Sequence, residues 1–467
     1  MSNLSQDTAN TTFRDRVPTV TDSGKRNWIY ALKPKGKIYR WRSLLSWLYI
    51  VVFFSMPFIS INGNPMLQLN VVEGKFSILG MIFWPQDFFI FGIAMVTFIV
   101  FIVLFTMIFG RIFCGWACPQ TIFMEMLFRK IEWWIEGNPN QQRTLDKAPW
   151  NASKITRKLA KHVLFFLLSF IIANTFLAYI IGKDALLKIV TEPINMHPGG
   201  LIAILFFTGA FYGVYAFVRE LVCTVICPYG RLQSVLLDKD SIIVAYDYKR
   251  GEQRGKGKRP ADGLGDCIDC NQCVVVCPTG IDIRNGTQME CINCTACIDA
   301  CNNIMIRLNL PEGLIRYASE NQLAENKKFR FTGKMKVYTG ILLLLITVMG
   351  FTLATRSDVE AKILRAKGQL YQEVGTDSLS NLYNIIMVNK THEPVPIHLQ
   401  AENMHGVIKF VGKKHMIVPK EGHGEAMFFL IINKKELKTR ETEVRIGVYQ
   451  NGVKIKTIKT SFLGYVE

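Results

Sequence analysis

The apolar residues of this chain are gathered into long runs and are not spread over amphipathic segments. Five runs carry no charged side chain and are long enough to cross a bilayer. They extend from Ser43 to Ile61, Phe88 to Phe109, Val163 to Gly182, Gly199 to Val218 and Val337 to Thr355. Each predicts a transmembrane helix. The polar segment before Lys25 has no apolar core and the first run has no cleavage site after it, so we expect a retained anchor and not a cleaved signal peptide.

A different pattern begins at Arg356, where a polar start with helical character gives way to alternating, β-branched runs. These runs predict strands from Leu382 to Val388, Val407 to Val411, Ala426 to Ile432, Glu443 to Gln450 and Val453 to Phe462. The pair Asn451-Gly452 is typical of a tight hairpin between the last two. The tail is therefore expected to form an antiparallel β-sandwich of immunoglobulin-like type.

Charge orients the predicted spans. The 467 residues include 55 Lys and Arg and carry a formal net charge of +18. Basic residues are dense between Lys25 and Arg42 and again between Arg129 and Lys161, which places these two segments in the cytoplasm. Five spans then leave residues 219–336 in the cytoplasm and the tail outside. Orientation and anionic lipid account for the positive charge, so nucleic acid is not an expected partner.

Two cysteine runs lie between the fourth and fifth spans. The first is Cys267-x2-Cys270-x2-Cys273-x3-Cys277, followed by Pro278. The second repeats the spacing with Cys291, Cys294, Cys297 and Cys301. This is the spacing of bacterial ferredoxins, in which the fourth cysteine of each run ligates the other cluster. A disulfide framework or a pair of zinc knuckles gives no reason for this spacing to occur twice.

The two runs thus predict two [4Fe-4S] clusters. The first cluster takes Cys267, Cys270, Cys273 and Cys301, and the second takes Cys291, Cys294, Cys297 and Cys277. Asn302 replaces the proline that follows the first run. Because proline bends the chain and removes a backbone donor, the second corner is expected to be looser.

The remaining four cysteines form two copies of one motif. Cys114-x3-Cys118-Pro119 ends the second span, Cys223-x3-Cys227-Pro228 ends the fourth, and Arg111 and Arg219 precede them. The chain therefore repeats a helical hairpin, and each copy places a thiol pair at the cytoplasmic membrane surface. The cysteines of a pair share one face if the helix continues, whereas the proline is suited to starting a new helix.

Three roles are open for these four cysteines. Soft thiolates favour Cu(I), zinc or iron–sulfur iron, and a dithiol can also carry redox chemistry. The neighbouring arginines are expected to lower the thiol pKa. Simple packing between helices is the alternative. Because the motif occurs twice in matching positions, a functional role is favoured, and we take Cys114, Cys118, Cys223 and Cys227 as the candidate catalytic residues.

Other cofactors find little support. A membrane haem needs axial histidines inside the bilayer, but none of the seven histidines lies in a predicted span, and His162 stands just before the third. The glycines from Gly251 to Gly265 form a basic linker without a nucleotide-binding pattern. Electrons must therefore come from a partner or from quinol. In the tail, Met404-His405 and His415-Met416 offer a copper site, although packing of the methionines is the favoured interpretation.

These features together resemble the FixG/RdxA/CcoG family of cytochrome oxidase accessory proteins, which is related to the NapH and NosR membrane ferredoxins. The resemblance covers nearly the whole chain from Trp28 and rests on the two Cys-x3-Cys-Pro motifs, the ferredoxin insert and the exported β-domain. It implies a bacterial inner-membrane protein that reduces Cu(II) to Cu(I) in support of cbb3-type oxidase assembly. It also implies that the ferredoxin cysteines carry electrons, that the motif cysteines handle copper, and that the oxidase assembly factors are partners.

The predicted fold class is a polytopic α-helical membrane protein with a 2[4Fe-4S] ferredoxin domain and an immunoglobulin-like β-sandwich. Its parts are a basic N-terminal segment (residues 1–42), a four-helix membrane region (43–218), a cytoplasmic ferredoxin domain (219–336), a fifth transmembrane helix (337–355) and a periplasmic β-domain (356–467). Two functions remain open. One is a cupric reductase, and the other is an electron-transfer subunit or assembly scaffold that performs no metal reduction of its own.

Overall fold

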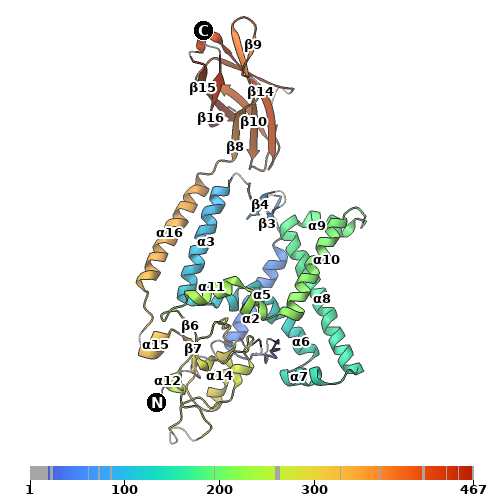
Figure 1. Cartoon of the computed structure of the whole chain (residues 1–467), viewed down its shortest axis with the longest axis vertical. Coiled ribbons are helices and arrows are strands. Elements are labelled where there is room, and N and C mark those ends of the chain that lie inside the picture. Colours follow the sequence, from blue (N-terminus) through green and yellow to red (C-terminus); the bar gives the residue numbers. More distant parts are fainter. Residues whose placement is uncertain are drawn as a thin grey trace. The chain divides into compact units, whose positions relative to one another are not determined.

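The computed structural model describes residues 19–464 except 21–24, 62, 72–73, 85–86, 194, 258–262, 327, 367, 369, 413–415, 438 and 451. The chain divides into two compact units (Figure 1). One comprises Met1–Ser60, Pro65–Gly74 and Phe88–Met349. The other comprises Ile61–Asn64, Lys75–Asp87 and Gly350–Glu467.

Four helices of the described chain are long and apolar enough to cross a bilayer. They are α3 (Phe88–Phe109), α8 (Ala152–Ile181), α10 (Pro198–Gly213) with its π-helical continuation η3 (Val214–Val218), and α16 (Gly333–Ala354). A helix of 22 residues such as α3 or α16 is about 33 Å long, enough for the hydrocarbon core. None of the most apolar stretch of α16 is buried inside the protein. An apolar helix with no protein around it requires lipid as its solvent.

The first predicted span differs from expectation. The helix here is α2 (Lys37–Ser55), which begins six residues before Ser43 and ends six before Ile61. It ends just before Pro57, because proline has no backbone N–H with which to continue the helical hydrogen bonds. Its first turns carry basic residues, so its uninterrupted apolar stretch is shorter than in the four helices above. The Tyr179 hydroxyl near the end of α8 nevertheless donates to the Phe53 carbonyl, 2.7 Å away, so α2 reaches the same depth as α8.

Short strands and helices connect the long helices. Five strands precede α3, namely β1 (Ser60–Ile61), β2 (Asn64–Pro65), β3 (Leu67–Asn70), β4 (Lys75–Ile78) and β5 (Met81–Phe83). The connections contain α4 (Ile112–Trp116), α5 (Pro119–Phe123), η2 (Met124–Phe128), α6 (Arg129–Ile135), α7 (Pro139–Lys147), α9 (Lys183–Thr191), η4 (Val222–Ile226) and α11 (Pro228–Leu236). Aromatic rings join η2, η3 and α8. Phe128 stacks on Tyr215 with centroids 4.2 Å apart and meets Phe165 edge-on at 4.9 Å.

The start of α8 also differs from the prediction. This helix begins at Ala152, eleven residues before Val163, because Asn151 caps it by accepting a hydrogen bond from the Lys154 backbone N–H at 2.8 Å. His162 therefore lies inside the helix. Its Nδ1 is 3.0 Å from the Tyr212 hydroxyl.

The ferredoxin region repeats one loop geometry. Its elements are β6 (Ile243–Tyr246), α12 (Tyr248–Gly251), α13 (Gln272–Val275), η5 (Ile283–Asn285), α14 (Ala296–Arg307), β7 (Ile315–Ala318) and α15 (Glu320–Glu325), with β6 and β7 paired antiparallel. Positive φ occurs at Asp269 and Asn271 in the first cysteine run and at the matching Asn293 and Thr295 in the second. Alternation of left- and right-handed residues points successive N–H groups into one concavity, as in many iron–sulfur sites.

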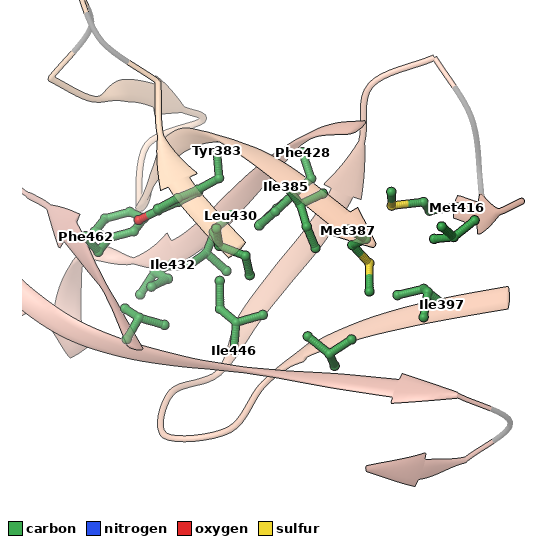
Figure 2. Close-up of a cluster of buried hydrophobic side chains, with 14 of the residues drawn as sticks. Tyr383, Ile385, Met387, Ile397, Met416, Phe428, Leu430, Ile432, Ile446 and Phe462 are labelled. Atoms are coloured by element: carbon green, nitrogen blue, oxygen red, sulfur yellow. The ribbon is translucent and has the colours of Figure 1, made fainter. Parts of the chain in front are cut away.

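The tail is a β-sandwich with apolar side chains packed between its strands (Figure 2). The strand pairs of its described residues are antiparallel. One sheet has the order β12-β14-β10-β8, with β9 also paired to β10, and the other has the order β13-β11-β15-β16. The strands are β8 (Val359–Arg365), β9 (Gln372–Val374), β10 (Ser378–Asn389), β11 (Val395–Ala401), β12 (Gly406–Phe410), β13 (Met416–Val418), β14 (His423–Asn433), β15 (Glu441–Gln450) and β16 (Val453–Leu463). Tyr383 stacks on Phe428 inside the core, with centroids 5.5 Å apart.

All five predicted strands are present, and the immunoglobulin-like fold is confirmed. The expected helical start of the tail is wrong, because β8 occupies it and pairs with β10. Gln450 pairs with Val453, which closes the predicted hairpin, although Asn451 lies outside the described residues.

Candidate iron–sulfur and thiol sites

The first cysteine set surrounds a small cavity. It is lined by all four predicted residues, Cys267, Cys270, Cys273 and Cys301. The first three lie on one loop, Cys267–Cys273, called the first loop below. Cys301 comes from α14, which follows the second run. The other walls include apolar side chains such as Ile304 and Leu314.

The second set surrounds a cavity of similar size. Its lining includes Cys291, Cys294 and Cys297 from the loop Cys291–Cys297, called the second loop below, and Cys277 from the first run. Cys273 also borders this cavity, so the two cavities share a wall. The crossed arrangement expected from the spacing therefore brings four thiols to each cavity.

The donor sets fit clusters better than single ions. All twelve cysteines are free. Among the described residues, no three His, Cys, Asp or Glu side chains approach closely enough to hold one metal ion. Four thiols spaced around a cavity suit a polynuclear cluster, whose irons lie inside the ring. Burial raises the pKa of Cys273 and of Cys301 to about 12, so a positively charged centre is needed to hold them as thiolates.

The four remaining cysteines, Cys114, Cys118, Cys223 and Cys227, are called the motif thiols below. The second cysteine of each pair has the same local structure. Cys118 is extended and caps α5, and Cys227 is extended and caps α11, with proline as the first residue of each helix. The helix thus restarts at the proline and does not continue through the pair.

The motif thiols lie near one another, just after the ends of α3 and η3. Cys114 is buried, and its thiol donates to Gln233 Oε1 at 2.9 Å. Cys223 Sγ is 3.9 Å from the Thr121 hydroxyl. Burial, together with the proximity of Cys118, raises the pKa of Cys223 to about 12. Cys118 and Cys227 in turn contribute to the raised pKa of Cys114, which is due mainly to burial.

The expected effect of the arginines is only partly present. Burial raises the pKa of Cys114 overall, and Arg111, with Nη2 3.9 Å from the sulfur, offsets only part of this rise. Arg219 is engaged by an acidic side chain. Its guanidinium forms hydrogen bonds of 2.7 and 2.8 Å with the two carboxylate oxygens of Glu132. The prediction that both arginines favour thiolates is therefore wrong for the second pair.

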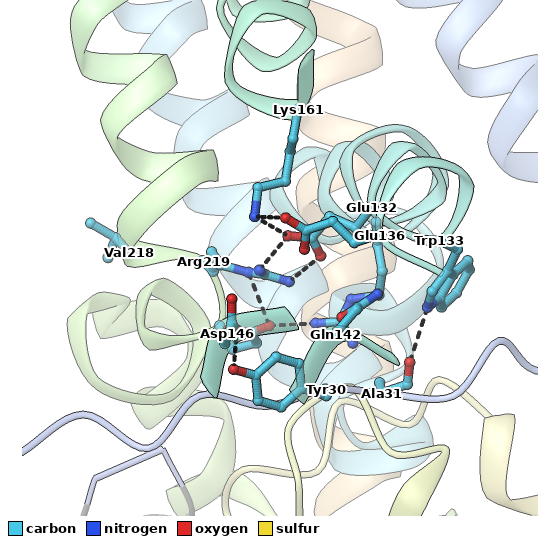
Figure 3. Close-up of polar contacts among 12 residues, drawn as sticks. Tyr30, Ala31, Glu132, Trp133, Glu136, Gln142, Asp146, Lys161, Val218 and Arg219 are labelled. Atoms are coloured by element: carbon cyan, nitrogen blue, oxygen red, sulfur yellow. Dashed lines mark hydrogen bonds and ion pairs between the residues drawn. The ribbon is translucent and has the colours of Figure 1, made fainter. Parts of the chain in front are cut away.

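A buried ionic network surrounds this arginine (Figure 3). Arg219 and Lys161 both point toward Glu132, and Lys161 Nζ also lies 2.9 Å from Glu136. Burial opposes ionisation of Glu132, but the charges of Arg219, Lys161 and Arg129 outweigh it and lower the pKa. The network joins α6, α8 and the end of η3. The sequence analysis did not predict this network. The presence of acidic residues in a strongly basic connection could have indicated it.

A contact between a motif thiol and the ferredoxin region was also missed. Cys114 packs in one buried apolar cluster with Cys294, Cys297 and Ile292 of the second loop. Trp116 Nε1 donates to the Asn293 carbonyl at 3.2 Å. The first motif pair and the second loop thus form one packed interface.

In the tail, the methionines and the described histidine of the candidate copper site have other partners. Met416 is buried in the sandwich core and Met404 packs against it, as expected for packing residues. His405 is almost fully exposed and pairs with Glu436 at 3.2 Å. His415 lies outside the described residues.

Family comparisons assign three segments of the chain. Residues 218–320 match a 4Fe-4S dicluster domain. Residues 91–138, which include the first motif pair, match a 4Fe-4S binding domain. Residues 349–465 match the IG-like fold at the C-terminus of FixG. The chain is therefore a membrane-associated iron–sulfur electron-transfer protein.

Three relatives match over most of their length. The chain is 29% identical over 423 residues to the nitrogen fixation protein FixG of Rhizobium meliloti, covering 81% of this chain and 80% of that protein. Protein RdxA of Cereibacter sphaeroides is 33% identical over 349 residues, which is 73% of each chain. Protein RdxB of the same organism is 31% identical over 389 residues, covering 79% of this chain and 80% of that one. Because RdxA and RdxB are both more than 30% identical to the chain and are each covered over more than two thirds of their length, the chain belongs to the FixG and RdxA family.

Proposed function

We propose that this protein reduces Cu(II) to Cu(I) at the motif thiols, with electrons delivered by two [4Fe-4S] clusters. The cupric ion is the substrate, and the Cu(I) produced supports assembly of a cbb3-type cytochrome c oxidase. The observation that carries the proposal is the packing of Cys114 against Cys294 and Cys297, because it leaves no intervening layer between a soft metal ligand and a cluster-binding loop.

In this proposal Cys267, Cys270, Cys273 and Cys301 hold one cluster, and Cys277, Cys291, Cys294 and Cys297 hold the other. The clusters supply one-electron redox chemistry when bound. The chain's own residues set the conditions for it. Gln233 Oε1 accepts the hydrogen bond of the Cys114 thiol, so the sulfur keeps its proton until a cation binds and displaces it.

Two lines of support come from the membrane part. Basic residues gather beside α2 and α8, which favours a cytoplasmic location for the ferredoxin region and for both motif pairs. The contact of Tyr179 with Phe53 supports α2 as a fifth crossing. The tail is then periplasmic in a bacterial inner membrane, with oxidase assembly factors as partners and the electron donor still to be identified.

The alternative is an electron-transfer subunit or assembly scaffold without metal reduction. One observation favours it: the motif thiols do not converge closely enough to hold a single ion in the described structure. A related alternative is that these thiols hold iron, since the first pair falls within a segment that matches a 4Fe-4S binding domain.

The test is a redox titration of purified protein. Two clusters predict about eight irons per chain, and a third cluster on the motif thiols predicts about twelve. Protein reduced with dithionite and freed of excess reductant is then mixed with Cu(II) under argon. The proposal predicts one Cu(I), trapped by a Cu(I)-specific chelator, for each cluster electron lost. Clusters that stay reduced in the presence of Cu(II) would favour the relay or scaffold.

A further inference from the structure

The Cys114 motif meets the ferredoxin region at a close backbone contact. Gly115 lies so near the second loop that a Cβ atom there would stand 2.3 Å from the Ile292 carbonyl oxygen and 3.0 Å from the backbone N and Cα of Cys294. Atoms cannot approach that closely, and the atoms that a Cβ would meet belong to the backbone, which cannot move aside as a side chain can. Gly115 is therefore required by the space that the second loop occupies.

Three polar contacts hold this approach in place. Trp116 Nε1 donates to the Asn293 carbonyl at 3.2 Å. On the opposite side Arg42, which is buried, donates through Nε to the Gly115 carbonyl at 2.8 Å. Arg111 donates through Nη1 to the Met289 carbonyl, just before the second loop. The interface is thus fixed from α2, from α4 and from the end of α3.

The second motif pair approaches the same part of the ferredoxin region. Cys223 lines a small cavity whose other walls include Pro278, Thr279 and Ile292. Pro278 and Thr279 follow Cys277, and Ile292 belongs to the second loop. Both motif pairs therefore face residues that surround the second cavity.

The first loop has a different environment. All residues that line its cavity fall between Tyr246 and Ile315, within the ferredoxin region itself. The apolar cluster that contains Cys114 includes Cys294 and Cys297 but no ligand of the first set. The two clusters are thus not equivalent with respect to the motif thiols.

From this asymmetry we infer that electrons leave the ferredoxin region through the second loop, with Cys114 as the first motif thiol on the route and Gly115 as the positioning residue. The inference rests on the proposed function. In each transfer, the centre held by the second loop loses one electron and is oxidised, and one Cu(II) ion gains that electron and becomes Cu(I). The electron transfer itself breaks no bond, and the proton of the Cys114 thiol leaves to water beforehand, when the cation binds. The centre held by the first loop is then the one that receives electrons from the donor.

The test compares Gly115→Ala with Gly209→Ala in full-length protein. A Cβ at Gly209, in α10, meets no atom within 4 Å, so this variant controls for the added methyl group. Both variants should keep the iron content of the wild type. We expect Gly115→Ala to slow reoxidation of the reduced clusters by Cu(II) about tenfold or more, because a small displacement of reacting groups is costly. Gly209→Ala should match the wild type, and a wild-type rate in Gly115→Ala would overturn the inference.

A second readout needs no copper. Redox titration followed by electron paramagnetic resonance resolves the two centres, and Cys291→Ser identifies the signal that belongs to the second loop. Gly115→Ala should change the midpoint potential and line shape of that signal and leave the other unchanged. Changes in both signals, or in neither, would contradict the one-sided contact. If the wild type fails to reduce Cu(II), the proposed function falls, while this titration still decides where the thiol motif contacts the ferredoxin region.

Single-cluster variants give an independent check on direction. In Cys270→Ser the remaining centre sits on the second loop and should still be oxidised by Cu(II) at the wild-type first-turnover rate. In Cys291→Ser the remaining centre sits on the first loop and should react about tenfold more slowly or worse. The reverse order would assign the exit to the first loop and refute the proposed route.

Discussion

The buried pair of Glu132 and Arg219 gives the sharpest stability prediction. Replacing Glu132 with Gln keeps the volume and one carbonyl acceptor but removes the negative charge that faces Arg219 at 2.7 and 2.8 Å. Both side chains are almost fully buried. Breaking a buried pair by removing one partner costs about 3–5 kcal/mol. Because Glu220 still lies 3.4 Å from Arg219 Nε, we expect a loss near the lower limit, about 3 kcal/mol.

The assay is thermal unfolding in detergent at fixed scan rate, since unfolding of a membrane protein of this size is rarely reversible. Glu132→Gln should unfold at a temperature lower by roughly 5 °C or more. Glu443→Gln is a matched control. Its carboxylate is exposed and pairs with Arg445 at 3.3 Å, so its loss should change little. Equal unfolding temperatures for Glu132→Gln and the wild type would refute the view that this pair fastens α6 to the end of η3.

The same pair predicts a pH dependence. The pKa of Glu132 is lowered in the folded protein, so the contribution of its charge is fully present above the ordinary Glu pKa of about 4.3. It is lost as the pH falls from there through the lowered pKa. The difference in unfolding temperature between wild type and Glu132→Gln should therefore be constant from neutral pH down to about pH 5 and shrink below it. A difference that grows on acidification would contradict this assignment.

Further predictions concern the clusters and the topology. Cys270→Ser and Cys294→Ser should each lose about half of the bound iron, because one site retains only three thiolates. Unchanged iron and spectra in both would show the ligand sets to be wrong. A reporter that requires export should be active after Glu467 and inactive near Gly255, and a reporter that requires the cytoplasm should behave in the opposite way. Reversed activities would exclude the five-span topology.

The sequence was most informative where chemistry depends on local spacing. Two runs of cysteines at a fixed interval were enough to partition eight thiols between two cavities, because the loop and the following helix determine where each sulfur lies. The same holds for the strands from Ser378 to Asn389 and from His423 to Asn433, whose alternation reflects one buried face.

Longer-range features could not be predicted in this way. Gly115 has an ordinary local role in the sequence, and only the approach of Ile292 and Cys294, far along the chain, explains why no side chain fits there. Arg219 was noticed for its position before Cys223, but its partner Glu132 lies on another element. Strand β8 was missed because its short alternation is weak and its pairing with β10 supplies the stabilisation.

The central claim is that the motif thiols handle copper with electrons from the clusters. The measurement is the rate of Cu(II) reduction by dithionite-reduced protein in two double variants, Cys114→Ser with Cys118→Ser, and Cys223→Ser with Cys227→Ser. Serine nearly conserves volume but is a poor ligand for Cu(I), so each variant should keep full iron content and lose most of the activity. Wild-type rates in both, at full iron content, would contradict the account and leave these cysteines a packing role.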